Sequence, residues 1–277
     1  MMTVAPSDIE SAARKLCVRA CTMLPPETAM HIECAADADT SPEAREILSR
    51  MTEDFIRCGL ERQPLCAAAD STLVYADIGQ DISVDTGELE SAAASGVRAG
   101  YEQCGMPSAG EIELRQRSVS ASGIRLTVCP QCFKCTDSRT VSRFSPSCES
   151  SCLIRFITSS AESAAHRLCP PMVVGVGLAE SAEAARLLAE RALIRPTDTR
   201  NPSPPLAELE DSALESINAL GIGPERVGGD TTALAVSVEA AAAPGCAIFC
   251  AVEFSCHAAR AAYAEIQRKE EPSHCAV

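Results

Sequence analysis

The sequence contains no tryptophan and few other aromatic residues, with three tyrosines and six phenylalanines in 277 residues. It also lacks an excess of basic residues: 24 lysines and arginines stand against 38 aspartates and glutamates, a formal net charge of −14. Binding to nucleic acid usually needs a basic surface for the phosphates, and often aromatic side chains on which bases stack. We therefore expect no nucleic-acid partner.

Long uncharged apolar segments are also missing, so we expect no membrane partner. The first ten residues have neither the basic nor the apolar region of an export signal. Hydrophobic residues make up 46% and charged residues 22%, which is ordinary for a globular protein. Sixteen cysteines without such a signal favour reduced thiols or metal ligands over a disulfide scaffold, and we expect a cytoplasmic protein.

Several catalytic motifs are absent. The four histidines are scattered, with no His-Glu-x-x-His, and no Gly-x-Ser-x-Gly is present, which disfavours zinc-protease and serine-hydrolase chemistry. Gly175 and Gly177 follow an expected strand, but Glu180 stands where a dinucleotide-binding motif needs its third glycine. The glycine-rich segment 221–231 lacks the Gly-Lys-Ser/Thr end of a phosphate-binding loop.

Helical signals dominate the first 60 residues. Ser7 to Glu10 fit a capping box for a helix toward Met23, and Ser41-Pro42-Glu43 predicts a second helix to about Arg57. Later helices are expected from a cap at Thr86 toward Tyr101, in the alanine-rich segment through Ile194, before Gly221, and from His257 to about Lys269.

Strands alternate with these helices from residue 71 onward. Strands are expected at 71–78 and 172–177, and two further apolar strands follow the glycine-rich segment. The alternating segments 111–115 and 124–128 predict an antiparallel pair. We therefore predict an α+β fold with a mixed sheet, flanking helices and a helical N-terminal segment over residues 1–60 of one domain spanning residues 1–277.

Cys129, Cys132 and Cys135 have Cys-x2-Cys-x2-Cys spacing, which is typical of zinc and iron–sulfur ligands. The fourth cysteine of a bacterial ferredoxin motif is missing at its expected distance. A cysteine-rich chain also produces such groups by composition, because a free cysteine is often a small buried apolar residue. Both interpretations stay open.

Most of the chain from about residue 41 resembles the alpha region of the oxygen-labile fumarases and tartrate dehydratases, a family of iron–sulfur hydro-lyases. The resemblance lies in motifs that occur in the family's order. They are Gln63-Pro-Leu-Cys66, Ile78-Gly-Gln-Asp81, Gly96-Val-Arg-Ala-Gly-Tyr-Glu102, Cys169-Pro-Pro-Met-Val-Val-Gly-Val-Gly177, Arg195-Pro196, Asn201-Pro-Ser-Pro204, Gly221-Ile-Gly-Pro224, Gly228-Gly-Asp-Thr-Thr-Ala-Leu234 and Cys256-His-Ala-Ala-Arg260.

The resemblance implies a [4Fe-4S] cluster with Cys66, Cys169 and Cys256 as its ligands. One iron of such a cluster has no protein ligand and acts as a Lewis acid on the substrate. The implied reaction is the reversible hydration or dehydration of a small dicarboxylate, fumarate/malate first and tartrate next. The resemblance also implies a separate beta subunit and a homo-oligomer of alpha–beta pairs, whereas it assigns no catalytic side chain in this chain.

The sequence departs from the family at several polar positions. Ala67, Ala68 and Ala69 replace residues that orient substrate, and the segment 133–137 replaces a family loop. Pro107 and Pro244 lie near or at the positions of an expected arginine and histidine. Fewer cations and donors should weaken dicarboxylate binding or change the substrate. The alternative is a non-catalytic relative that binds a metal or iron–sulfur cluster in a redox or regulatory role.

Overall fold

The computed structural model describes residues 2–106, 110–241 and 247–266, so Pro107 and Pro244 lie outside the described residues. The chain forms two compact units. Unit 1 comprises residues 1–23, 62–131 and 260–277, and unit 2 comprises residues 24–61 and 132–259. The prediction of a single domain over residues 1–277 stays a prediction, and each unit is described separately below.

Unit 1 contains a mixed four-stranded sheet in the order β10-β5-β2-β4. Strand β2 (Ser71–Gly79) runs parallel to β4 (Glu111–Val119) and antiparallel to β5 (Ile124–Gln131), and β5 also pairs antiparallel with β10 (Ala262–Ile266). Two short strands, β1 (Met2–Thr3) and β3 (Ile82–Ser83), form a separate parallel pair. The Leu-Val-Tyr-Ala centre of β2 is buried, which suits an interior strand.

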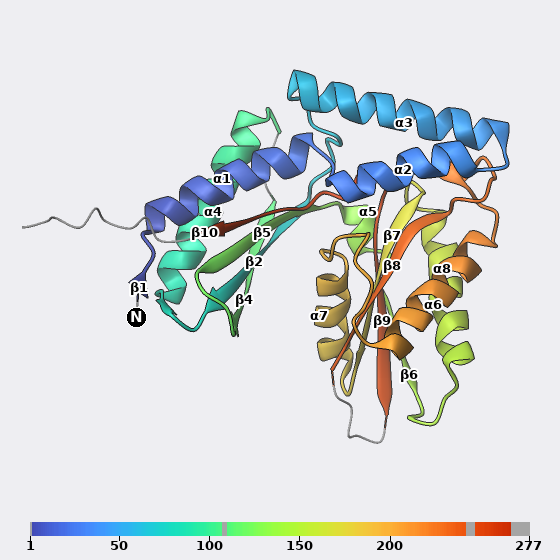
Figure 1. The fold of residues 1–277 in the computed structure, drawn as a ribbon. Helices are drawn as coiled ribbons and strands as arrows, with labels where there is room; N and C mark the ends of the chain where they lie inside the picture. The colour runs from blue at the N-terminus through green and yellow to red at the C-terminus, as the bar shows by residue number, and fades with distance from the viewer. Residues whose placement is uncertain (1, 107–109, 242–246, 267–277) are drawn as a thin grey trace, which may run out of the picture. The chain divides into compact units, whose positions relative to one another are not determined.

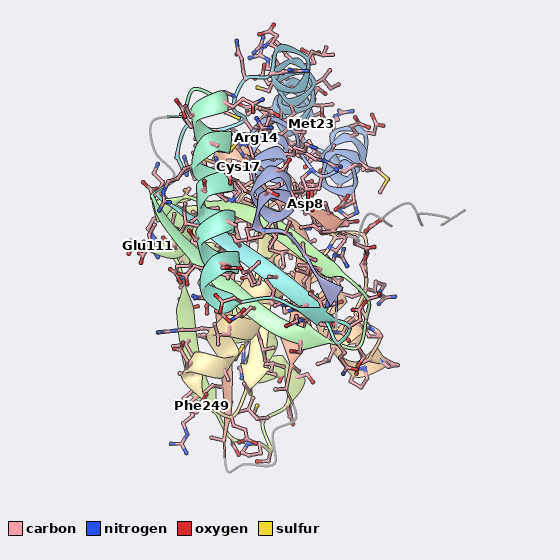
Figure 2. The ribbon with its side chains drawn as sticks, turned by 90° about the vertical axis from the view of Figure 1, so that its left-hand side faces the viewer. Asp8, Arg14, Cys17, Met23, Glu111 and Phe249 are labelled. Carbon is pink, nitrogen blue, oxygen red and sulfur yellow. The ribbon has the colours of Figure 1, made fainter. Side chains whose placement is uncertain are left out.

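Helices α1 (Pro6–Thr22) and α4 (Thr86–Gln103) lie side by side against this sheet, and Cys17 lies where α1 meets α4 (Figure 2). Glycines in α4 permit the close approach, since a Cβ at Gly96 would lie 2.3 Å from the Glu10 carbonyl oxygen. The predicted capping box at Ser7 is wrong, because α1 starts at Pro6 and has no side-chain cap. The cap of α4 is Asp85, whose carboxylate accepts from Glu88 N at 3.0 Å, rather than Thr86.

Unit 2 contains a second mixed sheet in the order β6-β9-β7-β8. Its strands are β6 (Thr140–Phe144), β7 (Met172–Ala179), β8 (Ala233–Ala240) and β9 (Ile248–Ser255). Strand β7 is parallel to β8 and antiparallel to β9, which also pairs antiparallel with β6. Every residue of β7 is buried, as its continuous apolar sequence predicts.

Helices cover both faces of the unit 2 sheet. Helices α6 (Ser150–Ala165) and α8 (Pro204–Asn218) share one apolar core with the sheet, whereas α7 (Ala182–Ala192) packs on the opposite face (Figure 1). Unit 2 also includes α2 (Pro26–Ala38), α3 (Pro42–Glu61), the short helix α5 (Phe133–Thr136) and the 3-10 turn η1 (Pro224–Arg226).

Gly175 and Gly177 bring α7 close to β7. A Cβ at Gly177 would lie 1.9 Å from the Ala185 carbonyl oxygen, and one at Gly175 would lie 2.4 Å from the Ala189 carbonyl oxygen. No residue larger than glycine fits at either position without moving α7. This pair of glycines therefore serves helix–sheet packing.

The predicted α+β class, the mixed sheet and the helical N-terminal segment are confirmed, but two local predictions are wrong. Strands β4 and β5 do not pair with each other, because the buried strand β2 lies between them. The helix predicted from His257 is absent from the described residues up to 266; strand β10 pairs there with β5, and Lys269 lies outside the described residues. Among the described helices, none has the length and apolarity to cross a membrane.

Candidate functional site

Strand register brings two of the predicted ligands to one edge of the unit 2 sheet. Val173, near the start of β7, pairs with Ser255 at the end of antiparallel β9. Cys169 precedes β7 and Cys256 follows β9, so both thiols are near the same sheet edge. Both cysteines are half-buried.

His257 links the two cysteine segments. Its main-chain N–H donates to the Cys169 carbonyl at 3.3 Å, and its ring Nδ1 lies 3.1 Å from the same oxygen. The Nδ1 atom is also 3.5 Å from a Glu225 carboxylate oxygen, and the ring packs against Phe55 with centroids 5.7 Å apart. The histidine thus holds the segment before β7 against the segment after β9.

Charged groups of both signs surround Cys169. Burial raises the pKa of the Cys169 thiol, Glu225 and Cys256 raise it further, and Lys134 and Arg226 oppose these effects. Arg226 has a left-handed backbone with φ of 67°, and its guanidinium donates to the Leu168 carbonyl at 2.7 Å. This arginine therefore fixes the residue directly before Cys169.

Two further thiols lie beside Cys256. Cys132 and Cys256 both pack against the apolar core that includes Cys135, and the short helix α5 places Cys135 N 3.0 Å from the Cys132 carbonyl. The hydrogen bond from Cys135 lowers the pKa of Cys132 to about 6. Hydrogen bonds with Cys132 and Cys256, together with burial, raise the pKa of Cys135 far above its ordinary value.

Cys129 has a different environment from the other two members of its sequence motif. It lies in β5 of unit 1, where its sulfur accepts a hydrogen bond from Gln131 Nε2 at 3.1 Å, whereas Cys132 and Cys135 belong to unit 2. Within the residues that the structure describes, no group of three or more His, Cys, Asp or Glu is arranged to hold a metal ion. A metal site at Cys129, Cys132 and Cys135 stays a prediction.

Cys66 lies in unit 1, on a loop fixed by a buried arginine. The guanidinium of Arg260, which is 4% exposed, donates to the Cys66 carbonyl at 3.0 Å and to the Ala68 carbonyl. Leu65 N donates to the Cys21 carbonyl at 2.8 Å, so the end of α1 supports the same loop. Ala67 and Ala68 are exposed. Sequence reasoning missed this role of Arg260, which requires a contact between residues 192 to 194 positions apart.

The glycine-rich segment is held by an aspartate that sequence reasoning also missed. One carboxylate oxygen of Asp39 accepts from Asp230 N at 2.9 Å and from Thr231 N at 3.1 Å, and the other accepts from Ser41 N at 3.0 Å. Asp39 is 3% exposed. Its position before Ser41-Pro42 was the available sequence signal, since aspartate commonly accepts main-chain bonds at helix starts.

The proline-rich segment is anchored by Glu210 of α8. Its carboxylate pairs with Arg195 and accepts from Val238 N at 2.8 Å and from Asn201 N at 3.0 Å. Asn201 Nδ2 also donates to the Val238 carbonyl at 2.7 Å. The Arg195-Pro and Asn201-Pro motifs therefore fasten this segment to the end of β8.

The family model described as Fumarate hydratase (Fumerase) matches residues 10–265. The chain belongs to this family.

Individual relatives match a smaller part of the chain. The L(+)-tartrate dehydratase subunit alpha of Escherichia coli (strain K12) is 39% identical over 108 residues, which are 39% of this chain and 36% of that subunit. A putative L(+)-tartrate dehydratase subunit alpha of Methanocaldococcus jannaschii is 38% identical over 112 residues, 40% of this chain and 39% of the relative. The matched segment thus spans well under half the length of these relatives.

The two thiols at this edge of the unit 2 sheet, Cys169 and Cys256, are of the ligand type that an iron–sulfur cluster needs. Thiolates are the usual ligands of such clusters, and the strand register places Cys169, before β7, and Cys256, after β9, at the same edge of the sheet. Cys169 and Cys256 both belong to unit 2, whereas Cys66 belongs to unit 1.

Proposed function

We propose that this chain is the alpha subunit of a [4Fe-4S]-dependent hydro-lyase of the fumarase family. Its reaction is the reversible hydration and dehydration of a small dicarboxylate, with fumarate/malate the first candidate and tartrate the second. The cluster ligands are Cys66, Cys169 and Cys256. The observation that carries the proposal is the convergence of Cys169 and Cys256, bridged by His257, in a chain matched over residues 10–265 by the family model.

When bound, a cluster with one open iron supplies a Lewis acid that polarises a substrate oxygen. The protein groups have other roles. Lys134 and Arg226 place positive charge around Cys169, where the overall charge of −14 would otherwise repel a dicarboxylate. Arg260 holds the main chain of the Cys66 loop, so that this cysteine keeps one position.

The catalytic unit includes a separate beta subunit. This part of the proposal rests on the names of the two relatives, both of which are alpha subunits. The beta subunit would supply substrate-binding and acid/base groups that Ala67, Ala68 and Ala69 do not provide. The assembly is a homo-oligomer of alpha–beta pairs, located in the cytoplasm.

Ligand substitution tests the cluster. The full chain is reconstituted anaerobically with iron and sulfide, and iron and sulfide per chain are measured together with the cluster absorbance. We expect about four irons per chain in the wild type, and loss of most of this iron in the Cys66→Ala, Cys169→Ala and Cys256→Ala variants. Cys34→Ala is the matched control, because Cys34 is exposed on α2.

An activity assay tests the reaction. The reconstituted chain is combined with its beta subunit, and hydration of fumarate and dehydration of malate and tartrate are followed anaerobically. Turnover of one of these dicarboxylates is the expected result. A complete cluster with no turnover of any of the three would overturn the catalytic part of the proposal while leaving the ligand set intact.

A non-catalytic metal or iron–sulfur protein is the second candidate. The packing of Cys132 and Cys256 against the core that includes Cys135 favours it, because Cys132 and Cys135 lie outside the family ligand set. Its signature would be the opposite pattern of metal loss: binding abolished by Cys132→Ala and Cys135→Ala, but retained by Cys66→Ala.

A further inference from the structure

Strand β4 forms one edge of the unit 1 sheet. It spans the nine residues Glu111–Val119, and within the described residues it pairs with β2 alone (Figure 1). The strand contains no proline or glycine, and no bulge interrupts its register with β2. Such features commonly protect an edge, because the main-chain N–H and C=O groups along it are able to pair with another strand. Strand β4 can therefore accept a further strand.

The charges of β4 change sign at its middle. Glu111 and Glu113 precede Leu114, whereas Arg115 and Arg117 follow it. Because side chains alternate between the two faces of a strand, all four charged residues lie on the same face. Glu113 and Arg115 form an ion pair at 2.6 Å, and both side chains are partly exposed. Read in the opposite direction, the strand presents the opposite sign at each of the four positions.

We propose that β4 pairs antiparallel with β4 of a second copy of this chain, about a two-fold axis at Leu114. Residue 111 then lies opposite residue 117 of the second copy, and residue 113 lies opposite residue 115, so every glutamate of one strand faces an arginine of the other. Two-fold symmetry forms each of these pairs twice. The proposal rests on the proposed function for the homo-oligomer of alpha–beta pairs, and it names the surface at which two alpha subunits meet.

The other face of β4 supports the same register. Ile112 and Leu114 lie on that face and pack against the apolar core of unit 1. In the joined sheet Leu114 would lie opposite its own counterpart at the axis, and Ile112 would lie opposite Gln116. Cross-strand neighbours of this kind stabilise a sheet. The apolar residues of both strands would therefore stay at the centre of the joined sheet, on the face that already packs on the core.

Neighbouring registers are less favourable. An axis at residue 113 would place Glu113 opposite its own counterpart, and an axis at residue 115 would do the same with Arg115, so that like charges face each other. A parallel arrangement in register would also place each charge opposite its own kind. A shift of the pairing by one residue would turn the charged face of one strand toward the apolar face of the other. The charge pattern thus selects the antiparallel register centred on residue 114.

The charge balance of β4 favours a second copy over a partner of uniform charge. The chain carries a net charge of −14, but the two glutamates and two arginines of β4 cancel. A uniformly acidic or basic strand would be attracted by one half of β4 and repelled by the other. Arg117, which forms an ion pair with Asp77 of β2 at 2.8 Å, would lie between that carboxylate and Glu111 of the second copy.

Sedimentation velocity of the full chain alone tests the pairing. We expect a monomer–dimer equilibrium with a dissociation constant of about micromolar size, because a strand edge is a small interface. Glu113→Arg and Arg115→Glu each turn two attractive pairs of the dimer into repulsive ones, and each should weaken self-association at least about tenfold. Glu90→Arg is the matched control, since Glu90 is exposed on α4 and should leave the equilibrium unchanged.

An equimolar mixture of the two variants separates strand pairing from effects on folding. In a mixed dimer, residue 113 of each chain meets the opposite charge at residue 115 of the other. The mixture should therefore dimerise at least about tenfold more tightly than either variant alone. The ion pair between residues 113 and 115 within each chain stays broken in the mixture, so only pairing between chains predicts this recovery.

Hydrogen exchange locates the interface in the wild type without any substitution. Amides of residues 111–117 should exchange severalfold more slowly at concentrations above the dissociation constant than below it. Strand β10, the other edge of the same sheet, is the internal control, and its exchange should not depend on concentration.

A chain that stays monomeric, a mixture that dimerises no better than its components, or exchange of β4 that ignores concentration would overturn the pairing. Binding of the beta subunit that Glu113→Arg weakens, in a chain that does not self-associate, would assign β4 to the beta subunit instead. None of these measurements needs a cluster or turnover. If the chain dimerises through β4 but binds no iron, the pairing holds and the proposed function fails; if a monomer binds iron and turns over a dicarboxylate, the reverse is true.

Discussion

The imidazole Nδ1 of His257 lies 3.1 Å from the main-chain carbonyl of Cys169, although the two residues are 88 positions apart in the sequence. This bond joins the segment before β7 to the segment after β9. Together with the bond from the His257 main-chain N–H to the same oxygen, it holds the segment that carries Cys169 against the segment that carries Cys256.

The His257→Ala variant tests this link. Loss of one hydrogen bond should lower the free energy of unfolding by about 0.5–1.5 kcal/mol, and should speed the loss of iron from the reconstituted chain to a chelator. Urea unfolding and the rate of iron release are the measurements. His166→Ala is the control, since His166 is exposed at the end of α6; equal effects of both variants would contradict the role of His257.

Substitution of Glu210 should destabilise the fold strongly. Its side chain is 5% exposed and pairs with Arg195, which is 12% exposed. The Glu210→Ala variant removes one of the two carboxylates that pair with Arg195, since Glu239 remains 3.0 Å from the guanidinium, and it takes away the acceptor of Val238 N and Asn201 N. It should lower the free energy of unfolding by about 1.5–3 kcal/mol. Denaturant unfolding measures this value, and exposed Glu208→Ala should stay within about 0.5 kcal/mol of the wild type.

The glycine-rich segment should depend on the charge of Asp39. The Asp39→Asn variant loses a charged acceptor shared by Asp230 N and Thr231 N, and we expect a loss of about 1.5–3 kcal/mol in stability. Hydrogen exchange of residues 228–232 should accelerate in the same variant. Exposed Asp37→Asn should leave both quantities unchanged, and a similar response from it would refute the assignment.

Gly177→Ala should displace α7 from the sheet. Its new Cβ would meet the Ala185 carbonyl oxygen at 1.9 Å and Ala189 N at 2.6 Å, both main-chain atoms that cannot rotate away. We expect a loss of about 1–3 kcal/mol or more in the free energy of unfolding. Gly87→Ala, where the nearest atom is the Asp85 carboxylate at 3.3 Å, should show no such loss.

Alkylation of Cys132 should show an unusual pH dependence. Its pKa, lowered to about 6 chiefly by the Cys135 hydrogen bond, makes the reactive thiolate the major form above pH 6 and the protonated thiol the major form below it. The rate of its reaction with iodoacetamide, followed by peptide mass spectrometry, should therefore level off near neutral pH. In Cys135→Ala the midpoint should rise toward about 8.5, the ordinary cysteine value; an unchanged midpoint would contradict the assigned cause.

Local sequence signals predicted local structure well. Strand β2 spans Ser71–Gly79 against a predicted 71–78, and the continuous apolar segment from Met172 forms the buried strand β7. Helix α3 begins at Pro42, as the Ser-Pro-Glu signal predicts. These features depend on residues close in sequence, so their energetics are largely present in the local pattern.

Strand pairing was predicted less well. The segments at β4 and β5 alternate as a hairpin would, yet the more apolar β2 takes the central position between them. The segment after Ala262 has a sequence that suits a helix, but its pairing with β5 makes it strand β10. Such choices depend on which distant segment supplies hydrogen bonds and buried surface, and neighbouring residues do not encode that information.

The sequence by itself determined the family, because the family model matches residues 10–265. Only the tertiary structure decided which side chains meet. Cys129 belongs to unit 1, whereas Cys132 and Cys135 belong to unit 2. Cys256 packs against the core that includes Cys135, and the Arg260 guanidinium donates to the Cys66 carbonyl. These contacts join residues more than a hundred positions apart, and only the burial and pairing of whole strands and helices brings such residues together.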